Sequence, residues 1–208
     1  MKSSEDKYGT LPLPYLVCEP EPGENDSIGD RILVYLHGSG DRGASAGNLL
    51  TGWGLPKLLA NGLEFPFTVV SPVCPENRIW HPEMVNGFLD RLISGAGLFK
   101  SRIILSGYSM GATGVYAFQA EYPGKVHGLI PVAGRVTGFS EENMALVPTF
   151  AVYGDRDERL VESDIEKRFE RIRARGGRAV LRVLEGKGHF ISDAAYTLGE
   201  IKDWIVGL

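Results

Sequence analysis

Short apolar runs alternate with amphipathic segments over most of this chain, and this alternation constrains its fold more than any other feature. Predicted strands lie at 15–18, 31–36, 67–71, 102–107, 126–134, 148–155 and 179–185, and predicted helices at 83–97, 110–121, 161–172 and 194–205. Strands that alternate with helices in this way form a mostly parallel sheet with helices on both faces. The sequence therefore predicts an α/β fold.

The length of the chain bears on its domain organisation. Its 208 residues are enough for one domain with a sizeable core, so a single domain over 1–208 is expected, with residues 1–12 as a flexible tail. The polar loop 19–30 joins the first two strands, which predicts that they pair antiparallel. His127 falls within an apolar run and is expected to be a core residue with its hydrogen bonds satisfied.

Composition and charge exclude several classes of protein. The net charge of −4 gives no electrostatic basis for binding nucleic acid, and the basic run Glu166–Arg178 has the apolar spacing of a solvated helix. No segment approaches the roughly 18 consecutive apolar residues of a membrane span, and residues 1–10 lack a secretory pattern. Cys18 and Cys74 are two thiols without metal-ligand neighbours, so both are expected to pack in the core of a cytoplasmic protein.

The segment Gly107-Tyr108-Ser109-Met110-Gly111 follows a buried strand and precedes a helix. A G-x-S-x-G pattern in this context is typical of a nucleophile elbow, a tight turn that exposes a serine hydroxyl above the sheet. The two glycines remove side chains that would collide with the neighbouring backbone. Ser109 is therefore the predicted nucleophile, although the pattern alone could also be an ordinary turn between a strand and a helix.

A serine hydroxyl becomes a good nucleophile only when a base removes its proton. The base is expected to be a histidine late in the chain, after an acid, in the order Ser, Asp, His. His189 follows the last predicted strand and meets this requirement. The other histidines do not: His37 belongs to a glycine-rich turn, His81 to a loop and His127 to a strand.

The acid that orients the base is expected just past the strand that ends near Tyr153, where three carboxylates follow. Asp157 is the predicted partner of His189, because it lies far enough along the loop to reach the imidazole. Asp155 is the alternative, although an aspartate at that position is more often used to organise the turn. Glu158 is the third carboxylate of the loop.

An oxyanion hole needs two backbone N–H groups that point at the tetrahedral oxygen. One is expected from Met110, the residue after the nucleophile. The second is expected from Ser39, in the His37-Gly38-Ser39-Gly40 turn that follows an early apolar strand. This turn alone could be a plain glycine-rich connection, and its combination with Ser109, Asp157 and His189 is what favours the functional interpretation.

Four segments together resemble the α/β-hydrolase superfamily, and within it the phospholipase/carboxylesterase group of acyl-protein thioesterases and peptidase-like esterases related to dienelactone hydrolases. They are LVYLHGSGDRG, SPVCPENRIWHPE, RIILSGYSMGATGVYAFQAEYP and VYGDRDERL, and the resemblance extends over 31–208. It implies a serine hydrolase that works through an acyl-enzyme, with Ser109, Asp157 and His189 as the triad.

Two sequence features qualify the resemblance. Relatives commonly have a second glycine after the elbow, where this chain has Ala112, which should only reduce close packing. The segment 136–147 is too short for a large lid, so an open site with little or no lid is expected, which favours short or exposed esters.

Trp80 is the candidate for a wall of the substrate pocket, although a large aromatic residue more often serves packing.

The combined expectation is a serine carboxylesterase that acts on a small-molecule ester or thioester and needs no cofactor or metal. Thioesterase, lysophospholipase or peptidase activity would use the same residues and remains an alternative. A hydrolase fold converted to a binding protein is a second alternative, and an acyltransferase a third that would need a closed pocket. The apolar C-terminal segment could pack within a monomer or support a homodimer. No stable insertion in a membrane is expected.

Overall fold

The structure is a computed structural model, and it describes residues 1–20, 31–99, 101–160 and 164–208. Its strands are β1 Lys2–Ser4, β2 Tyr15–Glu19, β3 Arg31–Leu36, β4 Thr68–Pro72, β5 Arg102–Tyr108, β6 Gly128–Val132, β7 Thr149–Gly154 and β8 Ala179–Leu184. Its α-helices are α1 Leu55–Ala60, α2 Pro82–Gly95, α3 Met110–Glu121, α4 Glu141–Ala145, α5 Ile165–Ala174, α6 Ser192–Tyr196 and α7 Gly199–Val206. Two short 3-10 helices, η1 Ser39–Asp41 and η2 Ala46–Leu50, follow β3.

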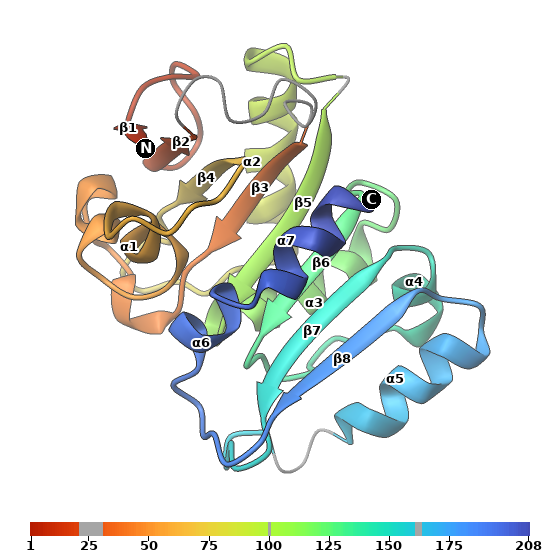
Figure 1. Ribbon diagram of the computed structural model, residues 1–208. Coiled ribbons are helices and arrows are strands. Elements are labelled where there is room, and N and C mark those ends of the chain that lie inside the picture. The colour runs from red at the N-terminus through yellow and green to blue at the C-terminus, as the bar shows by residue number, and fades with distance from the viewer. Residues whose placement is uncertain (21–30, 100, 161–163) are drawn as a thin grey trace.

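The strands form one twisted sheet in the order β1-β2-β4-β3-β5-β6-β7-β8 (Figure 1). The strands from β4 to β8 in this order are parallel, and only β1 and β2 run antiparallel to their neighbours. The predicted α/β class with a mostly parallel sheet is confirmed. Because all six parallel strands end at the same edge, the loops that follow them lie close together there.

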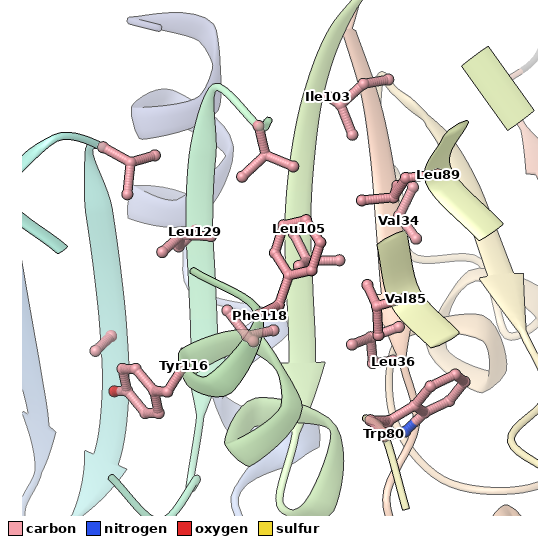
Figure 2. Packing of buried hydrophobic residues seen from close by; sticks show 14 of the residues in the cluster. Val34, Leu36, Trp80, Val85, Leu89, Ile103, Leu105, Tyr116, Phe118 and Leu129 are labelled. Atoms are coloured by element: carbon pink, nitrogen blue, oxygen red, sulfur yellow. The ribbon is translucent and has the colours of Figure 1, made fainter. Parts of the chain in front are cut away.

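Helices cover both faces of the sheet, as predicted, and each face has its own apolar core (Figure 1). Successive residues of a strand point to opposite faces. Val34 therefore packs with α2 and α3 on one face, as Figure 2 shows for this core, while Leu33 packs with α1, α6 and α7 on the other. Burial on both faces explains why the parallel strands read as continuous apolar runs.

Three predictions about the chain ends are wrong. Lys2–Ser4 form β1 on the edge of the sheet, and the Tyr8 N–H donates to the Tyr15 hydroxyl, so residues 1–12 are not a free tail. β2 pairs antiparallel with β4 and not with β3, and 21–30 of the predicted loop lie outside the described residues. The single C-terminal helix is two, because Gly199 begins α7 after an extended Leu198.

Further expectations from the sequence meet different outcomes. His127 is exposed before β6 and accepts a hydrogen bond from the Ile103 N–H at 3.1 Å, so its predicted place in the core is wrong. The basic run forms α5 with Ile165, Phe169 and Ile172 buried, which confirms a solvated helix. Its predicted start at 161–163 lies outside the described residues. Cys18 and Cys74 are buried free thiols. Within the described ranges, no helix combines the length and apolar character that a membrane crossing requires.

Candidate active site

Ser109 lies on a strained turn between β5 and α3, with φ 53° and ψ −111°. A non-glycine residue in such a region costs about 1–3 kcal/mol and persists only where its surroundings hold it. Here its N–H donates to the Val132 carbonyl at 2.9 Å. A Cβ on Gly107 would lie 2.5 Å from the Gly111 carbonyl carbon, and one on Gly111 would lie 1.9 Å from the Leu36 carbonyl oxygen. Both glycines are therefore required by the close approach of backbone segments.

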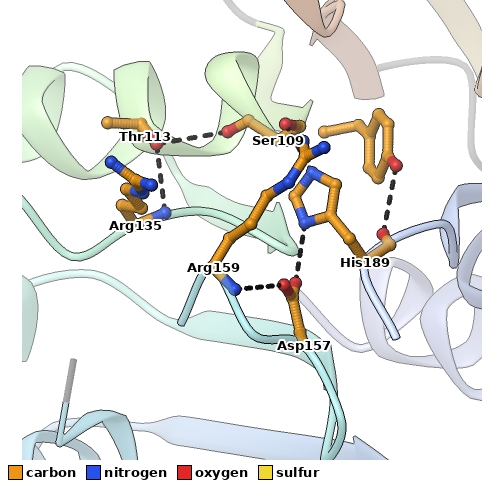
Figure 3. A network of polar contacts seen from close by, with 7 residues as sticks. Ser109, Thr113, Arg135, Asp157, Arg159 and His189 are labelled. Atoms are coloured by element: carbon orange, nitrogen blue, oxygen red, sulfur yellow. Dashed lines mark hydrogen bonds and ion pairs between the residues drawn. The ribbon is translucent and has the colours of Figure 1, made fainter. Parts of the chain in front are cut away.

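The three residues predicted as a triad are brought together at the carboxyl edge of the sheet. Ser109 Oγ lies 2.8 Å from His189 Nε2, and His189 Nδ1 lies 2.7 Å from Asp157 Oδ2 (Figure 3). Asp157 is 3% exposed, and its other oxygen accepts a hydrogen bond from the Arg159 N–H at 3.0 Å. The alternative carboxylates, Asp155 and Glu158, are exposed. The arrangement can pass a proton from the hydroxyl to the imidazole while the carboxylate fixes the ring.

Tyr108 supports the loop that carries His189. Its hydroxyl donates to the His189 carbonyl at 3.1 Å, and the two rings lie 5.6 Å apart. Burial raises the pKa of Tyr108 to about 12, so the hydroxyl keeps the proton that it donates. No pattern in the sequence points to Tyr108, because it occupies a variable position of the G-x-S-x-G motif and its partner is 81 residues away.

Both predicted oxyanion donors lie close to Ser109. Ser39 begins η1, beside Gly38, whose ideal Cβ would lie 3.7 Å from the Cβ of Ser109. Met110 begins α3 directly after Ser109. The first N–H groups of a helix have no partner inside it, so such groups are available to a developing negative charge.

His37 holds this loop with both of its ring nitrogens. Nδ1 donates to the Gly38 carbonyl at 2.7 Å, and Nε2 accepts from the Cys74 N–H at 2.9 Å. The Trp80 indole N–H donates to the His37 carbonyl at 2.9 Å, and its ring contacts the imidazole at 5.1 Å between centroids. His37 is thus a neutral support between two loops.

Trp80 was predicted to line the substrate pocket, and the structure corrects this placement. The side chain is 3% exposed and lies in the apolar core with residues of α2 and α3 (Figure 2). It lines neither of the depressions at Ser109. A Cβ added to Gly114 would lie only 2.5 Å from the Cβ of Trp80, so Trp80 packs directly against this glycine. Trp80 therefore supports the loop of His37 and Ser39 from its buried side.

We expect His37 to make stability depend on pH. Burial, with a smaller effect from Arg42, lowers the pKa of His37 from 6.5 to about 4. Between these values the unfolded chain binds a proton that the folded chain does not, so stability is highest above pH 6.5 and falls as the pH drops toward 4. The expected loss is about 3 kcal/mol.

Urea unfolding at pH 7 and at pH 4.5 tests this for the wild type and for His37→Gln, which has no imidazole to protonate. The wild type should lose about 2–3 kcal/mol more than the variant over this interval. Parallel losses in the two proteins would show that His37 does not carry the effect.

Two depressions open at Ser109 and His189, one beside Ser39 and one beside Met110. The first, about 200 Å³, is bordered by Trp53 and Phe190, whose exposed rings lie 6.2 Å apart. The second, about 300 Å³, extends from Met110 to Arg135. The segment 136–147 forms only α4, which packs on α3 and α5 and lines neither depression. Both depressions are therefore open from above, with no lid from that segment.

In the described part of the chain, no group of three or more His, Cys, Asp or Glu side chains is placed to hold a metal ion.

No protein-family model and no curated protein sequence matches this chain. Solved structures do match it. A thermostable esterase is 21% identical with a TM-score of 0.70, and the match covers 99% of this chain but only 62% of that one. Esterase PE8 is 21% identical with a TM-score of 0.68, over 95% of this chain and 99% of that one. Esterase 2 of Thermogutta terrifontis, phosphorylated by paraoxon, is 14% identical with a TM-score of 0.70, over 99% and 94%.

Identities this low carry information about architecture alone. The TM-scores of 0.68 to 0.70, over at least 95% of this chain, show that its sheet and helices are arranged as in these esterases. The chain therefore has the α/β-hydrolase fold.

Proposed function

We propose that this protein is a serine carboxylesterase that cleaves small carboxylic esters through an acyl-enzyme. The observation that carries the proposal is the unbroken chain of hydrogen bonds from Asp157 through His189 to Ser109. Its three members come from loops after β5, β7 and β8, so their meeting depends on the fold and not on proximity in sequence. The esterases that share the fold support ester hydrolysis as the reaction class.

In the proposed mechanism, Ser109 Oγ attacks the ester carbonyl while His189 Nε2 takes its proton. Asp157 holds the imidazole in the tautomer with a proton on Nδ1 and stabilises the imidazolium. The negative charge that develops on the carbonyl oxygen is met by the N–H groups of Ser39 and Met110. His189 then gives the proton to the leaving alcohol, and the acyl-enzyme forms.

Deacylation repeats these steps with water as the nucleophile. His189 takes a proton from the water as it attacks the acyl carbonyl, and returns it to Ser109 Oγ when the acid departs. The open depressions support small or exposed esters as substrates, since neither has the enclosed volume that a long acyl chain would fill. Thioesters and peptides would follow the same steps with a different leaving group.

Covalent labelling tests the assignment of the nucleophile. We expect a fluorophosphonate probe to add one adduct to the wild type, seen by intact mass, and none to Ser109→Ala. Ser94→Ala, at an exposed position on α2, is the control and should label like the wild type. The same proteins should hydrolyse p-nitrophenyl esters fastest between acetate and butyrate, with Ser109→Ala inactive.

Three other results would contradict the proposal in different ways. A folded wild type that does not label would favour a binding protein. Labelling that survives in Ser109→Ala would place the nucleophile elsewhere. A rate optimum at laurate would favour thioesterase or lysophospholipase activity on the same triad.

A further inference from the structure

The depression beside Met110 is strongly cationic. Its lining combines Arg135 and Arg159 with Ser109 and His189, and no carboxylate lines it. The nearest acid of the triad, Asp157, has a side chain with 0% exposure and is bound to His189. The whole chain carries a net charge of −4. The positive charge beside the nucleophile is therefore local and opposite in sign to the net charge of the chain.

Both arginines are attached to the catalytic residues through their backbones (Figure 3). The Arg159 N–H donates to Asp157 Oδ1 at 3.0 Å. The Arg135 N–H donates to the Thr113 hydroxyl at 3.1 Å, and this hydroxyl donates to the Ser109 carbonyl at 3.2 Å. The backbones of Arg135 and Arg159 are therefore held in place relative to Ser109. Their side chains extend from two different loops and line the same depression.

The guanidinium groups are free to bind a ligand. Over the described ranges, neither Arg135 nor Arg159 forms an ion pair, whereas Arg171 pairs with Glu141 and Arg182 with Glu200. The guanidinium of Arg159 lies over the ring of Phe190 at 5.7 Å, and this cation–π contact does not use its N–H groups in a hydrogen bond. An arginine fork of this kind binds a carboxylate with two parallel hydrogen bonds.

We propose that Arg135 and Arg159 form a subsite for a carboxylate on the substrate, so that the preferred esters carry a negative charge near the scissile bond. This inference rests on the proposed ester hydrolysis and specifies its substrate class. Because both guanidinium groups are exposed, salt and water weaken the attraction, and the expected preference over a neutral ester is about tenfold in kcat/KM.

Two pairs of substrates place the charge on one side of the ester or the other. Mono-4-nitrophenyl glutarate and 4-nitrophenyl valerate test the acid side. 4-Acetoxybenzoate and its amide, 4-acetoxybenzamide, test the alcohol side with nearly the same shape. We expect kcat/KM to be about tenfold higher for the charged member of at least one pair, and this preference to shrink from 50 mM to 500 mM salt. The pair that responds identifies the side of the ester that faces the arginines.

The variants give the decisive comparison. Arg135→Gln/Arg159→Gln should reduce the preference to about one, measured as the ratio of kcat/KM for the two substrates in the same protein. This ratio cancels any general effect on the triad, which contacts the backbone of Arg159. Arg178→Gln is the control. Arg178 is exposed and precedes the amino end of β8, whereas Ser109 lies at the carboxyl ends of the strands, so this change removes one charge elsewhere and should keep the preference. If the double variant does not fold, Arg135→Gln alone should reduce the ratio by about half or more.

Equal rates within both pairs, or a preference that persists in the double variant, would overturn the subsite. The neutral esters separate this failure from that of the proposed function. A wild type that cleaves valerate without favouring glutarate is an esterase with no carboxylate subsite. A wild type that cleaves none of the four esters and does not label with fluorophosphonate refutes ester hydrolysis itself.

Discussion

Replacing Asp157 by Asn is expected to lower kcat for ester hydrolysis by about 10⁴-fold with little change in stability. The two oxygens of Asp157 have different partners, Oδ1 with the Arg159 N–H and Oδ2 with His189 Nδ1. Asparagine can keep the first bond through its carbonyl oxygen, so the loop should hold its shape. Its amide would then face Nδ1 and donate to it. The imidazole proton would move to Nε2, and His189 could no longer accept the proton of Ser109.

The control for this variant is Asp155→Asn, two residues earlier on the same loop. Asp155 is exposed, so its change removes the same charge without touching the imidazole. Steady-state kinetics on p-nitrophenyl butyrate and urea unfolding should be measured for both. Asp155→Asn is expected to stay within about threefold of the wild type. A larger loss in Asp155→Asn than in Asp157→Asn would assign the acid to Asp155 instead.

Gly111→Ala is expected to cost more than about 3 kcal/mol of folding free energy, which is large for the addition of one methyl group. The new Cβ would lie 1.9 Å from the Leu36 carbonyl oxygen and 2.9 Å from that of His37. These are backbone atoms at the end of a central strand, so no side-chain rotation can relieve the contact. The first turn of α3 would have to move away from β3, and the elbow at Ser109 would move with it.

Gly87→Ala on α2 is the matched control, because nothing lies within 4 Å of its ideal Cβ. Alanine at an exposed helix position should add about 0.5–1 kcal/mol of stability relative to glycine. Urea unfolding of the two variants and the wild type makes the comparison, with soluble yield as a second measure for Gly111→Ala. Equal stabilities for Gly111→Ala and the wild type would mean that β3 and α3 are not packed as closely as the structure has them.

Much of the fold was predictable because the parallel strands are buried on both faces and therefore read as apolar runs. The bounds of β3 and α3 were predicted to the residue. Pairing at the edge was not, because nothing in Tyr15–Glu19 indicates whether β3 or β4 is its neighbour. The segment 194–205 was predicted as one helix, whereas Ala194 is exposed and a second helix begins at Gly199. Periodicity alone does not register such a break.

At the site, the order of residues along the chain and their positions after strand ends were enough to predict Ser109, Asp157 and His189. The structure joins these three residues by hydrogen bonds. The same reasoning favoured Asp157 over Asp155, because a carboxylate can reach His189 only from a certain distance past the strand end. Sequence order and strand ends could not find Tyr108, whose role depends on a partner carbonyl far along the chain. They also misplaced Trp80, because an aromatic residue before a helix gives no sign of which side of a loop it will occupy.

The positive φ of Ser109 links activity to a permanent loss of stability. A glycine would occupy this turn without strain, so the serine that the proposed reaction needs is the residue that least suits its own backbone. Selection for a robust fold alone would favour Gly at position 109. A serine at this position therefore marks a trade-off, in which the surrounding sheet supplies the stability that one reactive residue removes.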